Sequence, residues 1–71
     1  MGGKGITFYK SGNYCFVYDD DAEILEKEFK VTIVKKNEEW GIKRSHVILG
    51  YNDFIRLGIK LKEKNYQIIL R

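Results

Sequence analysis

The stretch that decides the fold is Ile6–Tyr18, which reads ITFYKSGNYCFVY. It contains two runs rich in β-branched and aromatic residues, Ile6–Lys10 and Asn13–Tyr18, and Ser11 with Gly12 separates them. Two such runs joined by a short turn that contains glycine are typical of a β-hairpin. The sequence therefore predicts that the chain opens its fold with two antiparallel strands.

The second of these runs has two chemically different faces. Side chains alternate along a strand, so Tyr14, Phe16 and Tyr18 are expected on one face, and Cys15 and Val17 on the other. Alternation leaves open whether the aromatic face is an exposed platform on which bases could stack or the core face of the sheet. For Cys15, a small buried hydrophobe is favoured over a reactive thiol.

A helix is expected after the hairpin, starting at Asp20. Asp20 and Glu23 have the spacing of a capping box, and acidic residues in a first turn suit the helix dipole. Ala22, Leu25 and Phe29 recur at helical spacing and predict the buried stripe of a helix that ends near Phe29.

The remainder of the chain repeats this alternation of strands and helices. The β-branched run Val31–Val34 predicts a third strand, and residues 42–49 predict a fourth. Asn52 is the expected N-cap of a second helix, Asn65 its left-handed C-terminal residue, and Tyr66–Leu70 a last strand. The stripe of that second helix is formed by Phe54, Leu57, Gly58 and Leu61.

The predicted fold class is α+β, with two helices packed as a second layer on a mixed sheet in the order β-β-α-β-β-α-β. The chain has 71 residues, which is enough for one core only, so residues 6–71 are expected to form one domain after a flexible leader at residues 1–5. One cysteine and one histidine exclude a disulfide framework and leave too few ligands for structural zinc.

Several functional classes do not fit the sequence. Asp19–Asp21 is attributed to the helix N-terminus rather than to a metal site, and neither a cofactor nor an enzymatic activity is expected. The GxxxxGK[ST] phosphate loop of ATPases is missing. No apolar run approaches the roughly 20 residues of a membrane span, and no signal peptide is recognisable, so the cytoplasm is the expected location without membrane partners.

Charge is distributed unevenly along the chain. Residues 1–39 hold six lysines and eight carboxylates, whereas residues 40–71 hold seven basic residues and two carboxylates. The two halves, at −2 and +5, give the net charge of +3. A basic half favours a partner such as nucleic acid or an acidic protein, although lysine-rich surfaces also serve solubility.

The motifs resemble those of the N-terminal mismatch-recognition domain, domain I, of the MutS family of DNA mismatch repair proteins. That domain typically reads F-Y-R-M-G-D-F-Y-E-L-F-Y-D-D-A, then eight residues of helix, then I-S-L-T-K-R. Phe8–Tyr18, Asp20–Ala22 and Val31–Lys36 match this pattern without a gap. Further along, Ile48–Asn52 is similar to the family's G-V-P-Y-H strand end, and Asn65–Arg71 to its G-x-x-V-A-I-C.

The resemblance implies a DNA-binding site centred on Tyr14. In the family, a phenylalanine at this position stacks on a mispaired base, and a glutamate two residues later hydrogen-bonds that base. Here Tyr14 retains a ring, while Phe16 replaces the glutamate. The resemblance therefore implies a stacking residue with weakened specificity for mismatches.

The predicted function is that of a small, non-enzymatic module that binds DNA or another nucleic acid. Its expected contacts are Tyr14, Phe16, Lys10, Lys35, Lys36, Lys43 and Arg44. The four basic residues between positions 35 and 44 could grip phosphates or could be solvated turn residues. Trp40 could anchor its loop or mark a binding patch, and the anchor is favoured. The alternative function is a protein-interaction or scaffold domain that keeps the fold without binding DNA.

Overall fold

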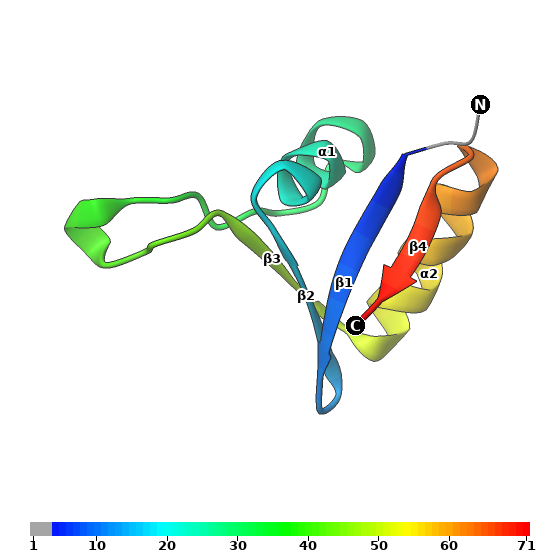
Figure 1. Ribbon diagram of the computed structural model, residues 1–71, viewed down its shortest axis with the longest axis horizontal. Coiled ribbons are helices and arrows are strands. Elements are labelled where there is room, and N and C mark those ends of the chain that lie inside the picture. The colour runs from blue at the N-terminus through cyan, green and yellow to red at the C-terminus, as the bar shows by residue number, and fades with distance from the viewer. Residues whose placement is uncertain (1–3) are drawn as a thin grey trace.

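The computed structural model describes residues 4–71, which form a four-stranded mixed sheet and two α-helices (Figure 1). In the sheet order β3-β2-β1-β4, the first three strands pair antiparallel and β4 runs parallel to β1. The predicted α+β class is confirmed. The elements are β1 (Gly5–Ser11), β2 (Tyr14–Tyr18), α1 (Asp19–Phe29), the short 3₁₀ helix η1 (Glu38–Trp40), β3 (His46–Gly50), α2 (Tyr51–Glu63) and β4 (Gln67–Leu70).

The predicted hairpin is present, but its turn is one residue later than expected. Ser11 pairs with Tyr14, so Gly12 and Asn13 form a two-residue loop. Gly12 has a φ of 59°, and a positive φ at the first loop position is a feature of the type II′ turn, which favours glycine there.

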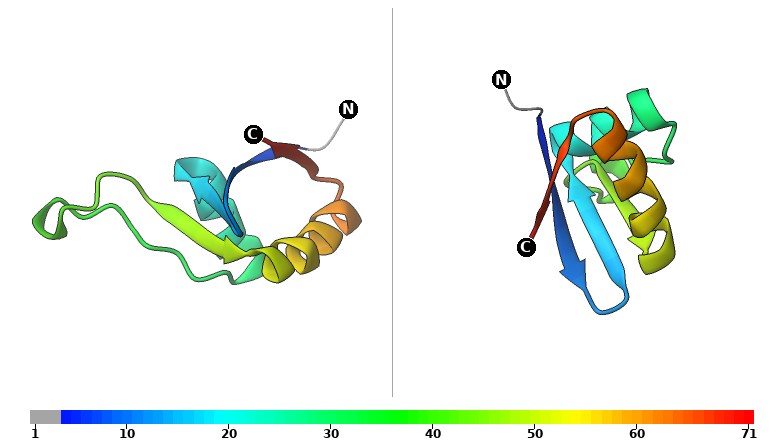
Figure 2. Two further views of the ribbon diagram at one scale, coloured as in Figure 1. Left: turned by 90° about the horizontal axis from the view of Figure 1, so that it is seen from below. Right: turned by 90° about the vertical axis from the view of Figure 1, so that its right-hand side faces the viewer.

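Both helices cover the same face of the sheet and bury one continuous core (the right-hand view of Figure 2). Its centre contains Cys15, which is 2% exposed, and burial raises the pKa of this thiol. Cys15 is therefore a buried hydrophobe, as expected. The core residues from the strands are Ile6, Phe8, Cys15, Val17, Val47 and Leu49, and those from the helices are Ala22, Leu25, Leu57 and Leu61.

The predicted helix caps are wrong. Within residues 4–71, no side chain caps the N-terminus of α1 or α2; the N-cap residues are Tyr18 and Gly50, both extended. Each strand runs directly into its helix, so the last strand residue takes the place that Asp20 and Asn52 were expected to fill. The predicted left-handed Asn65 is confirmed by its φ of 65°.

The predicted strand Val31–Val34 is not a strand of the sheet. Val31 and Ile33 pack half-buried against the core, and only Val34 makes a bridge, to His46 at the outer edge of β3. The third β segment of the expected order is thus a single bridge, and the next strand starts at His46 instead of Ile42. Val31 and Ile33 thus contribute to packing against the core, while Val34, which is exposed, makes the bridge.

Residues 34–46 leave the body of the protein as a long narrow arm (Figure 1 and the left-hand view of Figure 2). Two pairs of backbone hydrogen bonds hold it together, at 2.9 Å between Val34 and His46 and at 2.9 and 3.0 Å between Asn37 and Ile42. The helix η1 forms the tip, where the Asn37 side chain accepts a hydrogen bond from the N–H of Glu39.

The boundaries of the domain differ slightly from the expected ones. Gly5 already belongs to β1, and residues 1–3 of the predicted leader lie outside the described residues. Among residues 4–71, no helix has the length and apolar character needed to cross a membrane.

Candidate nucleic-acid interface

The face of the sheet opposite the helices carries a cluster of aromatic rings. Alternation places Cys15 and Val17 in the core, so the neighbouring side chains of β2 point to the other face. Strand register adds Tyr9, which pairs with Phe16, and Ile48, which pairs with Phe16 from the other side. We call this surface the open face and define it by Tyr9, Tyr14, Phe16, Tyr18 and Ile48.

The rings of the open face are accessible and lie close to one another. Tyr14 is 55% exposed and Tyr9 42% exposed, whereas Phe16 and Tyr18 are half-buried. The ring centroids of Tyr9 and Tyr18 are 5.5 Å apart, and the nearly parallel rings of Phe16 and Tyr18 are 6.4 Å apart. Exposed aromatic side chains on a sheet can stack with bases. The aromatic face is thus the solvent-facing one, the alternative that periodicity left open.

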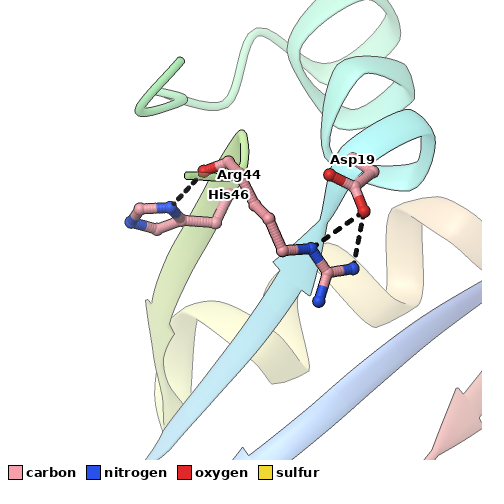
Figure 3. A network of polar contacts seen from close by, with 3 residues as sticks. All are labelled: Asp19, Arg44 and His46. Carbon is pink, nitrogen blue, oxygen red and sulfur yellow. Dashed lines mark hydrogen bonds and ion pairs between the residues drawn. The ribbon is translucent and has the colours of Figure 1, made fainter. Parts of the chain in front are cut away.

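One end of the open face is closed by an ion pair between Asp19 and Arg44 (Figure 3). Nε and Nη2 of Arg44 both donate to Oδ2 of Asp19, with Nε at 3.0 Å. The guanidinium lies 4.4 Å from the centroid of the Tyr18 ring, which is the distance of a cation–π contact. His46 contributes a hydrogen bond between Nδ1 and the carbonyl of Arg44 at 2.9 Å. These contacts fix the base of the arm against the start of α1.

The ion pair shifts the ionisation of both partners. The hydrogen bonds from Arg44 lower the pKa of Asp19 below its usual value, and the same bonds raise the pKa of Arg44. Asp19 has a φ of 55°, a conformation that aspartate and asparagine tolerate better than most residues.

Asp19→Asn is expected to remove a pH-dependent contribution to stability while keeping this backbone conformation. Because the pKa of Asp19 is lower in the folded state than in the unfolded state, the ion pair stabilises the fold above the unfolded pKa and loses its effect as the pH falls through the folded one. The variant should unfold at a lower temperature than the wild type near neutral pH, and the difference should vanish in acid. The effect is small, since both side chains are half-exposed.

Thermal unfolding from about pH 2 to pH 7 measures this difference. Asp20→Asn is the matched control, because Asp20 is exposed and has no side-chain partner among residues 4–71. A difference between Asp19→Asn and the wild type that persists unchanged in acid would contradict the assignment.

The basic residues predicted for phosphate contact are not gathered into one patch. Arg44 is held by Asp19, and the Nζ of Lys35 lies 3.7 Å from Oε1 of Glu26. Lys36 and Lys43 are exposed on the arm. Lys10 pairs with Cys15 and therefore lies on the helix side of the sheet, away from Tyr14 and Phe16. The structure thus brings together the two predicted aromatic residues but separates them from Lys10.

Two residues that contribute to this surface are absent from the predicted set. Tyr9 lies opposite Phe16 on the open face, and the hairpin register is the signal that finds it. Arg56 of α2, in the helix layer, lines a shallow hollow that also includes Tyr14 and the acidic residue Asp53. Arg56 is thus a basic residue close to Tyr14, and only the tertiary structure reveals that proximity.

Trp40 does not anchor its loop. It lies at the tip of the arm with 78% of its surface exposed, which contradicts the favoured interpretation. The tip is too far from the core for the indole to be buried against it (Figure 1).

The acidic run at the start of α1 has structural contacts. The N–H of Thr7 donates to Oδ2 of Asp21 at 3.1 Å, and Asp19 pairs with Arg44. Among residues 4–71, no group of histidine, cysteine and acidic side chains is arranged to hold a metal ion. These carboxylates make one corner of the open face unfavourable for phosphate.

Comparison of the chain with protein-family models, with curated proteins and with solved structures gave no match. The candidate interface therefore rests on the geometry and chemistry of its own residues.

Proposed function

We propose that this protein is a non-enzymatic module that binds nucleic acid by stacking unpaired bases on the open face. The observation that carries the proposal is the exposure of Tyr14, at 55%, on the same sheet face as Tyr9 and Phe16. Base–aromatic stacking contributes about 1–3 kcal/mol per base and tolerates any base sequence. A sheet that presents several rings therefore suits a single strand or a locally unstacked site.

The charges favour weak binding with a moderate dependence on salt. Phosphate contacts from lysine and arginine dominate the affinity of most proteins for duplex DNA. Two of the basic residues predicted to contact phosphate, Lys35 and Arg44, already have carboxylate partners. The net charge of the chain is only +3. The remaining exposed basic residues are Lys36 and Lys43 on the arm and Arg56 beside Tyr14. We therefore expect stacking rather than phosphate contact to set the preference.

The resemblance to domain I of the MutS family supports the same surface. Under that reading, Tyr14 occupies the position of the stacking residue, and a stacking residue must reach solvent, as Tyr14 does. Phe16, at the position of the family's glutamate, has no polar atom with which to hydrogen-bond a base. We therefore propose that any preference for mismatched over paired DNA is slight. A cytoplasmic location is part of the same proposal.

Tyr14→Ala is expected to weaken binding to a single-stranded oligonucleotide by roughly 5- to 150-fold, the equivalent of losing one stacked base. Fluorescence anisotropy with labelled single-stranded and duplex oligonucleotides at two salt concentrations measures this effect. Binding to duplex should fall much less than binding to single strand, and Tyr14→Phe, which keeps the ring, should bind like the wild type.

A second pair of variants tests the electrostatic contribution to nucleic-acid binding. Lys36→Ala with Lys43→Ala should weaken binding to both nucleic acids and flatten the salt dependence. Lys60→Ala with Lys62→Ala removes the same charge from the helix layer and is the matched control. If the wild-type protein binds neither nucleic acid in a salt-dependent manner, the nucleic-acid proposal is wrong.

In that case the function would be the second candidate, a protein-interaction domain. The specific observation in its favour is Trp40, exposed at the tip of an arm whose base is held in place by the Asp19–Arg44 pair. Exposed tryptophan is frequent among the residues that dominate protein interfaces.

A further inference from the structure

At the outer edge of β4, some backbone hydrogen-bonding groups have no partner among residues 4–71. The N–H of Gln67 donates to the carbonyl of Lys4 at 2.9 Å, and the N–H of Arg71 donates to the carbonyl of Phe8 at 2.8 Å. In a parallel strand, alternate residues direct both backbone groups to the same neighbour. Ile68 and Leu70 therefore direct their N–H and C=O groups away from β1, and among residues 4–71 no strand pairs with them.

Apart from the short length of β4, this edge lacks the features that usually prevent strands of different molecules from pairing. Natural sheets protect their edges with very short edge strands, lysine, proline, bulges or a covering helix or loop. The sequence of β4 is QIIL, without a charge or a proline. At the opposite edge of the sheet, by contrast, Val34 bridges to His46 of β3 and occupies part of that strand.

An exposed apolar stripe on α2 lies beside the same edge. Tyr51, Ile55 and Ile59 recur every fourth residue and are 53%, 44% and 59% exposed. Gly58, one position before Ile59, faces Ile68 of β4, since a Cβ at this glycine would lie 3.1 Å from Cδ1 of Ile68.

The stripe points away from the rest of the protein. The opposite side of α2 faces α1, where Arg56 and Lys60 line a hollow with Phe29. The right-hand view of Figure 2 looks at the edge formed by β4 and α2, with both elements side by side.

The geometry points to a homodimer in which the β4 strands of two copies pair antiparallel about a two-fold axis at Ile69. Ile68 of one copy then lies opposite Leu70 of the other, and each pair exchanges N–H to C=O hydrogen bonds in both directions. These are the residues of β4 whose backbone groups point away from β1. The sheets of the two copies join into one continuous sheet, and the α2 stripes approach each other across the seam.

The side chains along this seam are self-complementary. Leu70, 54% exposed, lies on the helix side of the sheet because it pairs with the buried Phe8, and it would be covered by Ile68 of the second copy. Ile69 lies on the open side and would meet its own symmetry mate. Gln67 would face Arg71, so no like charges oppose each other along the two paired strands. An interface with two-fold symmetry uses the same surface of both copies, so that surface must be complementary to itself.

Sedimentation equilibrium of the intact protein from micromolar to millimolar concentration tests the proposal. The wild type should show a monomer–dimer equilibrium that stops at the dimer. Leu70→Pro should raise the dimer dissociation constant by at least about tenfold, because it removes half of the hydrogen bonds across the seam. The N–H lost in this variant points away from β1, so the bonds within the monomer remain.

Ile55→Glu with Ile59→Glu tests the helix stripe without touching the strand edge, and should likewise yield monomer. Ile48→Glu is the matched control on the open face, at a residue 51% exposed, and should leave the dimer intact. Circular dichroism verifies that each variant is folded. A wild type that is monomeric throughout, that grows beyond a dimer, or that is dissociated by Ile48→Glu but not by the α2 variant would overturn the proposal.

Discussion

Phe8→Ala is expected to destabilise the protein by about 3–5 kcal/mol, the range for removing a fully buried phenylalanine. Phe8 is 0% exposed in the middle of β1, and its ring packs edge-on against Phe54 of α2 at a centroid distance of 4.9 Å. It joins the sheet to the helix layer. The total stability of a chain this short is on the order of 5 kcal/mol, so the variant should be largely unfolded at room temperature.

Urea denaturation followed by circular dichroism measures the loss. Tyr9→Ala is the matched control, since Tyr9 is the next residue of the same strand and points to the open face with 42% exposure. That variant should lose no more than about 1 kcal/mol. Equal unfolding midpoints for Phe8→Ala and the wild type would mean that the sheet does not have this register.

Leu61→Ala is expected to cost about 2–5 kcal/mol, because it leaves a cavity where the last turn of α2 meets the core. Leu61 is 0% exposed, and its carbonyl also accepts the hydrogen bond from the N–H of Tyr66 at 2.9 Å as the chain turns into β4.

Ile59→Ala provides the comparison on the same helix. Ile59 is 59% exposed, so its truncation should change the stability of the monomer by less than about 1 kcal/mol. Both variants are compared by thermal unfolding at low protein concentration, where self-association is minimal. Similar losses for the two variants would show that α2 packs with a different face.

Periodicity accounted for most of this fold. Ala22 and Leu25 of α1, and Leu57 and Leu61 of α2, are buried as their spacing predicted, and alternation separated Cys15 from the aromatic residues beside it. These patterns are reliable here because a helix or strand that packs on one side must repeat with its own geometric period.

The features that the sequence did not predict depend on tertiary contacts. Val31–Val34 has the composition of a strand, but Val31 and Ile33 pack against the core, and the backbone of this segment reaches β3 only at Val34. The positions of the basic side chains also depend on tertiary contacts. Nothing in the spacing of Asp19 and Arg44 indicates that they pair, because the intervening residues include a helix and the arm.

The position of Trp40 determines what the fluorescence of this protein can report. It is the single tryptophan of the chain and lies at the end of the arm, with 78% of its surface exposed. The indole is exposed to water both before and after the core unfolds. The wavelength of its emission should therefore change little on denaturation. For the same reason, a blue shift of that emission under native conditions would directly signal that another molecule has covered the tip of the arm.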